Sequence, residues 1–298
     1  MREPGMGRQA GGFLLLTLIW GTTWAAIRVG LRGMPPFTGV AVRFTIAGAL
    51  LLGLARAFRV RLGLGGRRER VLWVVNGILS FCVSYSAVYW AEQYLPSGLA
   101  AVLFATYPLA VAALAHFLLP GERLRRVAAL GVLLGFAGVA VIFSEDLALL
   151  GGEAMRRAGL VMLLSPLASA VATVAIKRWG SDLHPFSLSA VPMLIAGVTM
   201  GGVALLVERG SPLVLDVRSL GALLYLAVLG SAVAFTVYYW LLVRIGATRV
   251  ALVTYLIPIV AVAVGALFFD EPLRPRLLAG SALVLAGVVL VGRGRAPR

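Results

Sequence analysis

The chain has 298 residues, of which 60% are hydrophobic and 13% charged, and 27 Lys and Arg residues against 12 Asp and Glu give a net charge of +15. An average soluble domain is about 45–50% apolar and about 25% charged, so this composition excludes most soluble enzymes and indicates a membrane protein. A single cysteine, Cys82, also excludes a disulfide framework and a multi-thiolate metal site.

Ten apolar stretches are each long enough to cross a bilayer, whose core of about 30 Å needs about 20 apolar residues per helix. In chain order they are 10–28, 37–55, 71–91, 97–119, 127–143, 158–176, 186–207, 219–242, 248–269 and 276–292. The first stretch imitates a secretory signal, but it lacks a convincing cleavage site, so we expect it to be retained. The sequence therefore predicts an all-α integral membrane protein with ten transmembrane helices.

An even number of spans places both termini on one side of the membrane, and the basic residues indicate which side. With both termini inside, 18 of the 27 Lys and Arg residues lie in cytoplasmic segments, 8 lie in the opposite loops, and Arg43 lies within a span. We expect a multi-pass protein of a bacterial-type inner membrane, with both termini in the cytoplasm. The positive charge then serves topology and attraction to lipid. We expect no nucleic-acid partner, because no basic stripe with exposed aromatic residues lies outside the loops.

The two halves of the chain match each other at a shift of 149 or 150 residues. The matches include residue types that chance rarely aligns: Pro36-Phe37 with Pro185-Phe186, Tyr89-Trp90 with Tyr239-Trp240, Pro108 with Pro258, and Glu122 with Glu271. Each half holds five spans, an odd number, so the second half enters the membrane from the opposite side. The sequence predicts two inverted-topology repeats, 10–143 and 157–292, which suit alternating access around a midplane site.

Short motifs along almost the whole chain carry a resemblance to a known family. They are Ile19-Trp20-Gly21-Thr22-Thr23-Trp24, Arg43-Phe44, Ala91-Glu92-Gln93-Tyr94-Leu95-Pro96-Ser97, Tyr107-Pro108, Gly121-Glu122-Arg123-Leu124 and Glu271-Pro272-Leu273. In this order they resemble the EamA-type family of the drug/metabolite transporter superfamily. The resemblance implies a ten-helix inner-membrane carrier, usually an exporter of amino acids, other metabolites or toxic compounds. It implies a central cavity surrounded by spans 1–4 and 6–9, but one fold serves many substrates, so it does not name the substrate.

Arg43 is predicted about 9 Å of helix rise inside the second span. A charge at this depth is costly and normally faces protein, a partner or water. Glu92, after the third span, lies at the same side of the membrane. Arg43 is therefore expected either to form a fixed ion pair with Glu92 or to contact a substrate carboxylate.

Polar and aromatic residues gather in a few of the spans. Aromatic walls with a few convergent hydroxyl groups are typical of a small-molecule pocket, and they would suit an apolar or cationic ligand. With Arg43 and Glu92, the predicted cavity residues are Trp20, Thr23, Trp24, Ser80, Tyr85, Tyr89, Tyr107, Thr236, Tyr239 and Tyr255.

Three further features concern motion, proton coupling and packing. Pro108 and Pro258 lie mid-span at matched positions, where we expect hinges or helix breaks near the site. His116 is the only histidine at membrane depth, and it is either a proton-coupling group or a hydrogen-bonded structural residue. Small residues in the fifth span favour close packing within the bundle or in a homodimer; they are Gly131, Gly135 and Gly138.

We predict a secondary transporter, an exporter of small metabolites such as amino acids, that works by alternating access as a monomer or homodimer. A carrier that removes drugs or toxic cations is the alternative. An integral-membrane enzyme would need clustered acids or histidines, and no HExxH, GxSxG or P-loop pattern occurs in the sequence. A channel would show rings of charge or a filter motif. We therefore expect no catalytic residue, no metal and no cofactor, with a small-molecule substrate and the lipid bilayer as partners.

Overall fold

The computed structural model describes residues 6–63, 66–95, 97–142, 144, 152–268 and 275–293, and within these ranges it contains helices and no strand. The first half of the chain forms α1 (Met6–Gly30), α2 (Pro36–Ala57), α3 (Arg67–Asn76), the π-helical segment η1 (Gly77–Val83), α4 (Ser84–Ala91), α5 (Ser97–Phe104), α6 (Tyr107–Leu118) and α7 (Arg126–Ile142). The second half forms α9 (Glu153–Trp179), α10 (Pro185–Val207), α11 (Val217–Ala227), the π-helical segment η3 (Val228–Val233), α12 (Ala234–Leu242), α13 (Ala247–Ala251), α14 (Val253–Phe268) and α15 (Pro275–Arg293).

Seven helical segments of the described chain are long and apolar enough to cross a membrane. They are Gly7–Gly30, Pro36–Ala57, Arg67–Ala91, Leu99–Leu118, Glu153–Trp179, Pro185–Val207 and Val217–Leu242. Shorter apolar helices occupy the other three predicted spans, at Arg126–Ile142, Ala247–Val260 and Leu278–Val291. The prediction of an all-helical, multi-span membrane protein is confirmed for the described residues. The predicted end of the first repeat at Phe143, and the motif Glu271-Pro272-Leu273, lie outside them.

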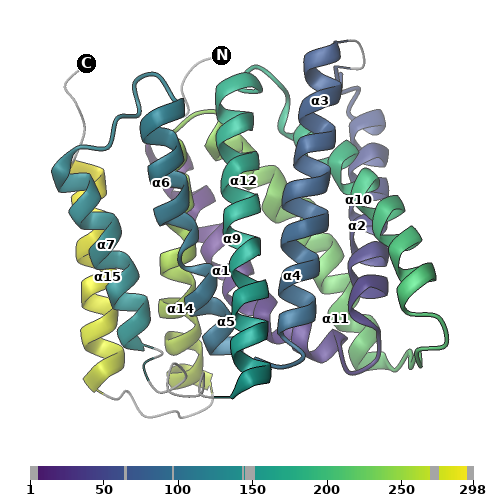
Figure 1. Cartoon of the computed structure of the whole chain (residues 1–298). Coiled ribbons are helices and arrows are strands. Elements are labelled where there is room, and N and C mark those ends of the chain that lie inside the picture. Colours follow the sequence, from purple (N-terminus) through teal and green to yellow (C-terminus); the bar gives the residue numbers. More distant parts are fainter. Residues whose placement is uncertain are drawn as a thin grey trace.

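The helices lie side by side in one bundle, and the start of α1 and the end of α15 lie at the same end of it, the upper end in Figure 1. In that view α7 and α15 pair at the left edge, and α2 and α10 lie at the right. The remaining helices fill the space between these two pairs. This arrangement leaves the centre of the bundle to helices from both halves of the chain.

Glycines let α7 and α15 approach to backbone contact. A Cβ atom built on Gly138 would lie 2.6 Å from the Gly280 oxygen, and one built on Gly287 would lie 2.5 Å from the Gly131 oxygen. A Cβ on Gly135 would lie 2.4 Å from the ring of Tyr255 on α14. The predicted small-residue face therefore packs within the chain, where any larger side chain would separate the helices.

The N-terminus of α2 is capped by a carboxylate from another helix. Glu208, at the end of α10, accepts hydrogen bonds from the backbone nitrogens of Phe37 (2.7 Å) and Thr38 (2.8 Å) and from the Thr38 hydroxyl (2.7 Å). The first N–H groups of a helix have no partner within the helix, and the helix dipole favours a negative charge beside them. Glu208 thus ties the start of α2 to the end of α10.

One π-helical segment interrupts the third long helical segment of each half. It is η1, between α3 and α4, in the first half and η3, between α11 and α12, in the second half. Neither segment is predicted from hydropathy, because hydropathy gives the length of a span but not the hydrogen-bond register inside it. A π-helical turn shifts backbone carbonyl groups away from their usual partners and often occurs at functional sites.

The two matched prolines do not produce matched breaks. Pro108 lies in the first turn of α6, directly after the interruption that follows Phe104. Pro258 lies inside α14, and the interruption of that span comes earlier, at Leu252 between α13 and α14. The Pro258 ring has no N–H to donate to the carbonyl four residues earlier, that of Thr254. Both spans are interrupted, but at different positions and by different local geometry.

We expect Glu208→Ala to destabilise the protein by about 1–2 kcal/mol, because it leaves the start of α2 without three hydrogen bonds. Thermal unfolding of the purified protein in detergent would show the loss as a lower Tm. The matched control is Arg209→Ala, since the exposed Arg209 guanidinium donates to the carbonyl of Leu205, four residues earlier in the chain. An equal change in Tm for the two variants would contradict the capping role.

Candidate functional site

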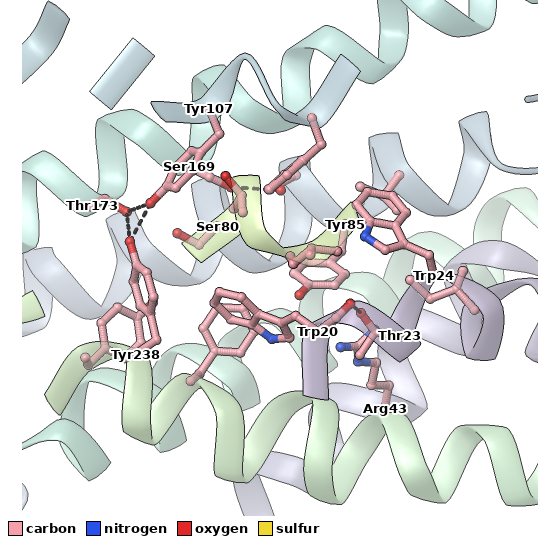
Figure 2. Close-up of a pocket in the computed structure, with 18 residues that line it drawn as sticks. Trp20, Thr23, Trp24, Arg43, Ser80, Tyr85, Tyr107, Ser169, Thr173 and Tyr238 are labelled. Atoms are coloured by element: carbon pink, nitrogen blue, oxygen red, sulfur yellow. Dashed lines mark hydrogen bonds between the residues drawn. The ribbon is translucent and has the colours of Figure 1, made fainter. Parts of the chain in front are cut away.

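A cavity of about 80 Å³ lies in the centre of the bundle, between helices of both halves. Its wall is formed by α1, α2, η1, α4, α5, α6, α9, α12 and α14. The residues that line it are Trp20, Thr23, Trp24, Ile27, Arg43, Ser80, Ser84, Tyr85, Val88, Phe104, Tyr107, Ser169, Thr173, Phe235, Tyr238, Tyr239, Thr254 and Ile257 (Figure 2).

Eight of the residues predicted from the sequence lie in this wall: Trp20, Thr23, Trp24, Arg43, Ser80, Tyr85, Tyr107 and Tyr239. The other predicted residues lie elsewhere. Tyr89 and Glu92 lie toward the end of α4 beyond the cavity, and Thr236 donates to the Ala232 carbonyl of its own helical segment (2.7 Å). Tyr255 is fully buried against α7, where its hydroxyl donates to the Val132 carbonyl (3.0 Å).

Arg43 is buried (1% exposed) and is held by neutral groups. Its Nε donates to the Ser231 hydroxyl (2.8 Å), its Nη1 to the Tyr89 hydroxyl (3.2 Å) and its Nη2 to the Gly230 carbonyl (3.3 Å). The guanidinium also lies 4.7 Å from the centroid of the Tyr85 ring. A guanidinium has five N–H donors. The three hydrogen bonds engage all three nitrogens of the guanidinium, and Tyr85 is a further hydrogen-bonding partner of Arg43.

The η3 segment provides two of the groups that hold Arg43. The Gly230 carbonyl accepts from Arg43 and also from the Trp20 indole nitrogen (3.4 Å). A Cβ at Gly230 would lie 3.1 Å from Thr23 and 3.4 Å from Arg43 Nη2, so glycine permits this close approach. The π-helical geometry of η3 therefore has a direct role, because it presents a backbone acceptor to a buried cation.

A hydroxyl cluster lies on the opposite side of the cavity from Arg43, as Figure 2 shows. Thr173 is 2.8 Å from the Tyr107 hydroxyl and 3.0 Å from the Tyr238 hydroxyl, and the two tyrosine hydroxyls also bond each other. Nearby, Ser169 donates to Ser84 (2.9 Å), and Ser84 bonds Ser165 (2.7 Å). The cavity thus has a cationic end and a neutral, hydroxyl-rich end.

Four residues of the hydroxyl-rich end were missed by the sequence analysis: Ser84, Ser169, Thr173 and Tyr238. A signal for two of them was present. Ser165, Ser169 and Thr173 recur every four residues along α9, which places three hydroxyl groups on one face of an apolar helix. No comparable spacing distinguishes Tyr238 from its neighbour Tyr239.

Aromatic rings form the wall between the two ends. The ring centroids of Trp20 and Phe235 are 5.4 Å apart, those of Trp24 and Phe104 are 5.8 Å apart, and Phe104 stacks on Tyr107 at 5.7 Å. Such edge and offset contacts stabilise the rings in fixed positions.

Glu92 is buried (3% exposed) just beyond the last residue of α4. Neither of its carboxylate oxygens has a hydrogen-bond partner among the described residues. Ion pairs in the described part of the chain join Arg68 to Asp182 and Arg157 to Glu153, and none joins Arg43 to Glu92. Of the two expectations for Arg43, the fixed ion pair is therefore not formed in this structure.

His116 accepts a hydrogen bond at Nδ1 from the Leu124 backbone nitrogen (2.9 Å), which braces the connection between α6 and α7 away from the cavity. In the described residues, no group of three or more His, Cys, Asp or Glu side chains could hold a metal ion.

Similar proteins identify the family. The family model described as EamA-like transporter family matches residues 10–144 and 156–293. An uncharacterized transporter of Bacillus subtilis, YvbV, is 29% identical over 98% of this chain and 93% of its own length. The uncharacterized inner membrane transporter YedA of Escherichia coli is 29% identical over 96% of this chain and 90% of its own.

A solved crystal structure has the same fold, with a TM-score of 0.81 at 21% identity over 95% of this chain and 96% of that one. Together with the family match over both halves, the central cavity and the apolar helices lead to one conclusion. The chain belongs to the EamA-like transporter family and is a multi-span membrane transporter.

Proposed function

We propose that this protein is a secondary transporter, an exporter of small metabolites that carry a carboxylate, such as amino acids or related compounds, across the inner membrane by alternating access. The observation that carries the proposal is the charge of the cavity. Among the described residues that line it, Arg43 alone is charged, and the groups that hold Arg43 are neutral.

A buried cation with neutral partners favours an anionic ligand. Removing a charge from water is costly, and hydrogen bonds to neutral acceptors offset only part of this cost. A carboxylate that approaches Arg43 from the cavity would supply the opposite charge that these neutral partners lack, and it would form the strong charge-assisted contact that guanidinium groups favour. The hydroxyl cluster at the other end suits a second polar group of the substrate, while the aromatic wall encloses its apolar part.

The same geometry argues against a toxic-cation carrier. Tyr85 offers the ring face that would attract a cation, but the Arg43 guanidinium already lies over it at 4.7 Å. A cationic ligand in the cavity would face the charge of Arg43, and no acidic residue is found among the described residues of the wall. The multidrug alternative therefore has less support than a carboxylate substrate.

The position of the cavity supports alternating access. Its wall contains α1, α2, η1 and α4–α6 from the first half and α9, α12 and α14 from the second half. A relative movement of two inverted halves would expose such a site first to one side of the membrane and then to the other. Export and cytoplasmic termini rest on the family resemblance and on the 18:8 distribution of basic residues.

We expect Arg43→Gln to raise the half-saturation concentration of a carboxylate substrate about 10- to 100-fold. This change is equivalent to about 1.5–3 kcal/mol, the contribution of a hydrogen bond to a charged group. The measurement is counterflow in proteoliposomes with labelled amino acids and other small carboxylates. Arg43→Lys should be intermediate, because it keeps the charge but loses the planar fork. Arg56→Gln, in the exposed last turn of the same helix, is the matched control.

Two results would contradict the carboxylate assignment. One is unchanged saturable exchange of the carboxylate in Arg43→Gln. The other is wild-type exchange of tetraphenylphosphonium that becomes stronger in Arg43→Gln, which would support the cation carrier. Linear flux without saturation in the wild type would instead indicate a channel.

The orientation of the termini predicts the accessibility of two engineered cysteines in a Cys82→Ser background. Ser211→Cys, in the exposed loop between α10 and α11, should react with an impermeant maleimide in intact cells. Ser181→Cys, in the exposed loop between α9 and α10, should react only after the membrane is permeabilised. The reverse pattern would place the termini outside.

A further inference from the structure

The buried carboxylate of Glu92 has no function in the cavity described above. It lies just outside the span Arg67–Ala91, 3% exposed, with no hydrogen-bond partner for either oxygen among the described residues. An ionised carboxylate in such a place would lack both water and donors, whereas a protonated carboxyl loses far less on burial. Burial raises the pKa of Glu92 to about 8, and the charges of Arg28 and Arg43 partly oppose that effect.

The ionisable groups around Glu92 come from three helices. Arg28 lies in the last turn of α1, Arg43 lies on α2, and Tyr89 precedes Glu92 by one helical turn on α4. From α9, which also packs on α4, the first turns carry three ionisable residues that are all exposed, and two of them pair with each other; they are Glu153, Arg156 and Arg157. Arg28 and Arg43 are thus the cations that act on Glu92.

Tyr89 joins Glu92 to the cavity. Its hydroxyl accepts a hydrogen bond from Arg43 Nη1 (3.2 Å), and its spacing of three residues from Glu92 places both on one face of the helix. The guanidinium that faces the cavity is also one of the two cations that act on Glu92, beside Arg28. Any anion that binds Arg43 reduces the positive field at Glu92.

We propose that Glu92 is a proton-binding site coupled to the cavity through Arg43, so that binding of a carboxylate substrate is accompanied by uptake of one proton at Glu92. In the empty cavity at high pH the Glu92 carboxylate is ionised and partly balances Arg43. When a substrate carboxylate binds Arg43, that balance is no longer needed, and the Glu92 carboxyl takes a proton from water. By linkage, protonation of Glu92 strengthens substrate binding by the same factor. The coupling to a substrate rests on the proposed function, whereas the coupling of Glu92 to Arg43 does not.

The first test needs no substrate. Infrared difference spectroscopy of the purified protein, titrated from pH 6 to pH 10, follows the C=O band of a protonated carboxyl group. We expect a band in the wild type that disappears on titration to high pH and is absent from Glu92→Gln. In Arg43→Gln the band should persist to a pH about one unit higher, because loss of a nearby cation favours the neutral acid. Arg56→Gln is the control and should titrate like the wild type.

Two outcomes of this test would overturn the proposal. One is the absence of any band that Glu92→Gln removes, which would mean that Glu92 is ionised throughout. The other is an unchanged titration in Arg43→Gln, which would mean that the two groups are not coupled. Glu92→Asp keeps a carboxyl group and should keep a titrating band, so a folding defect in one variant does not decide the result.

The second test measures the coupling to substrate. Binding of a transported carboxylate is followed by calorimetry at pH 9 in two buffers of different ionisation enthalpy, which gives the number of protons taken up. We expect net proton uptake when the wild type binds the carboxylate and none when Glu92→Gln binds it. The affinity of the wild type should decrease with rising pH, and that of Glu92→Gln should not. Equal proton uptake by the wild type and Glu92→Gln would overturn the coupling. If no carboxylate binds the wild type, the proposed function fails, while the Arg43-dependent titration of Glu92 still stands or falls by the first test.

Discussion

The burial of Arg43 is the constraint on which the site depends. A guanidinium in an apolar bundle must be supplied with acceptors, and regular transmembrane helices use their carbonyl groups internally. The structure meets this need with the π-helical segment η3, which presents the Gly230 carbonyl and the Ser231 hydroxyl to Arg43. Because Arg43 comes from α2 and η3 from the second half of the chain, the charge that faces the cavity also joins the two halves.

The helix pairs at the two edges of the bundle are held by direct packing and by a helix cap. At one edge α7 and α15 meet through glycines at backbone contact, and none of their described side chains lines the cavity. On the other side Glu208 ties the start of α2 to α10. In the described wall the charged group, Arg43, comes from α2, and the hydroxyl groups come from the helices that lie between these two pairs. A rigid periphery allows central helices with broken or π-helical sections to hold irregular backbone where it lines a polar space.

The sequence predicts the helical class and the position of the spans well, because both follow from length and hydropathy, which lipid imposes directly. It also identifies Arg43, since a charge within a span is exceptional by composition alone. It does less well where the outcome depends on which face of a helix points inward. Tyr239 and Tyr255 cannot be told apart by sequence pattern, yet Tyr239 lines the cavity while Tyr255 packs against Gly135 of α7. The π-helical segments were not predicted because hydropathy does not report the hydrogen-bond register inside a span, and the contact of η3 with Arg43 is a tertiary one.

The two proposed repeats share some of their ionisable residues and differ in others. Arg28 at the end of α1 corresponds to Lys177 near the end of α9, and Glu92 corresponds to Leu242. In the second half, Lys177 donates to the backbone carbonyls of Leu242 (2.8 Å) and Ile245 (2.9 Å), which cannot change their charge. In the first half, the corresponding cation, Arg28, acts on the carboxyl group of Glu92, which can change its charge. A symmetric scaffold can exchange inward and outward states equally well, so a proton can bias that exchange only through a group that one half has and the other lacks. Glu92 meets this condition, and Arg43, which corresponds to Pro192, meets it as well.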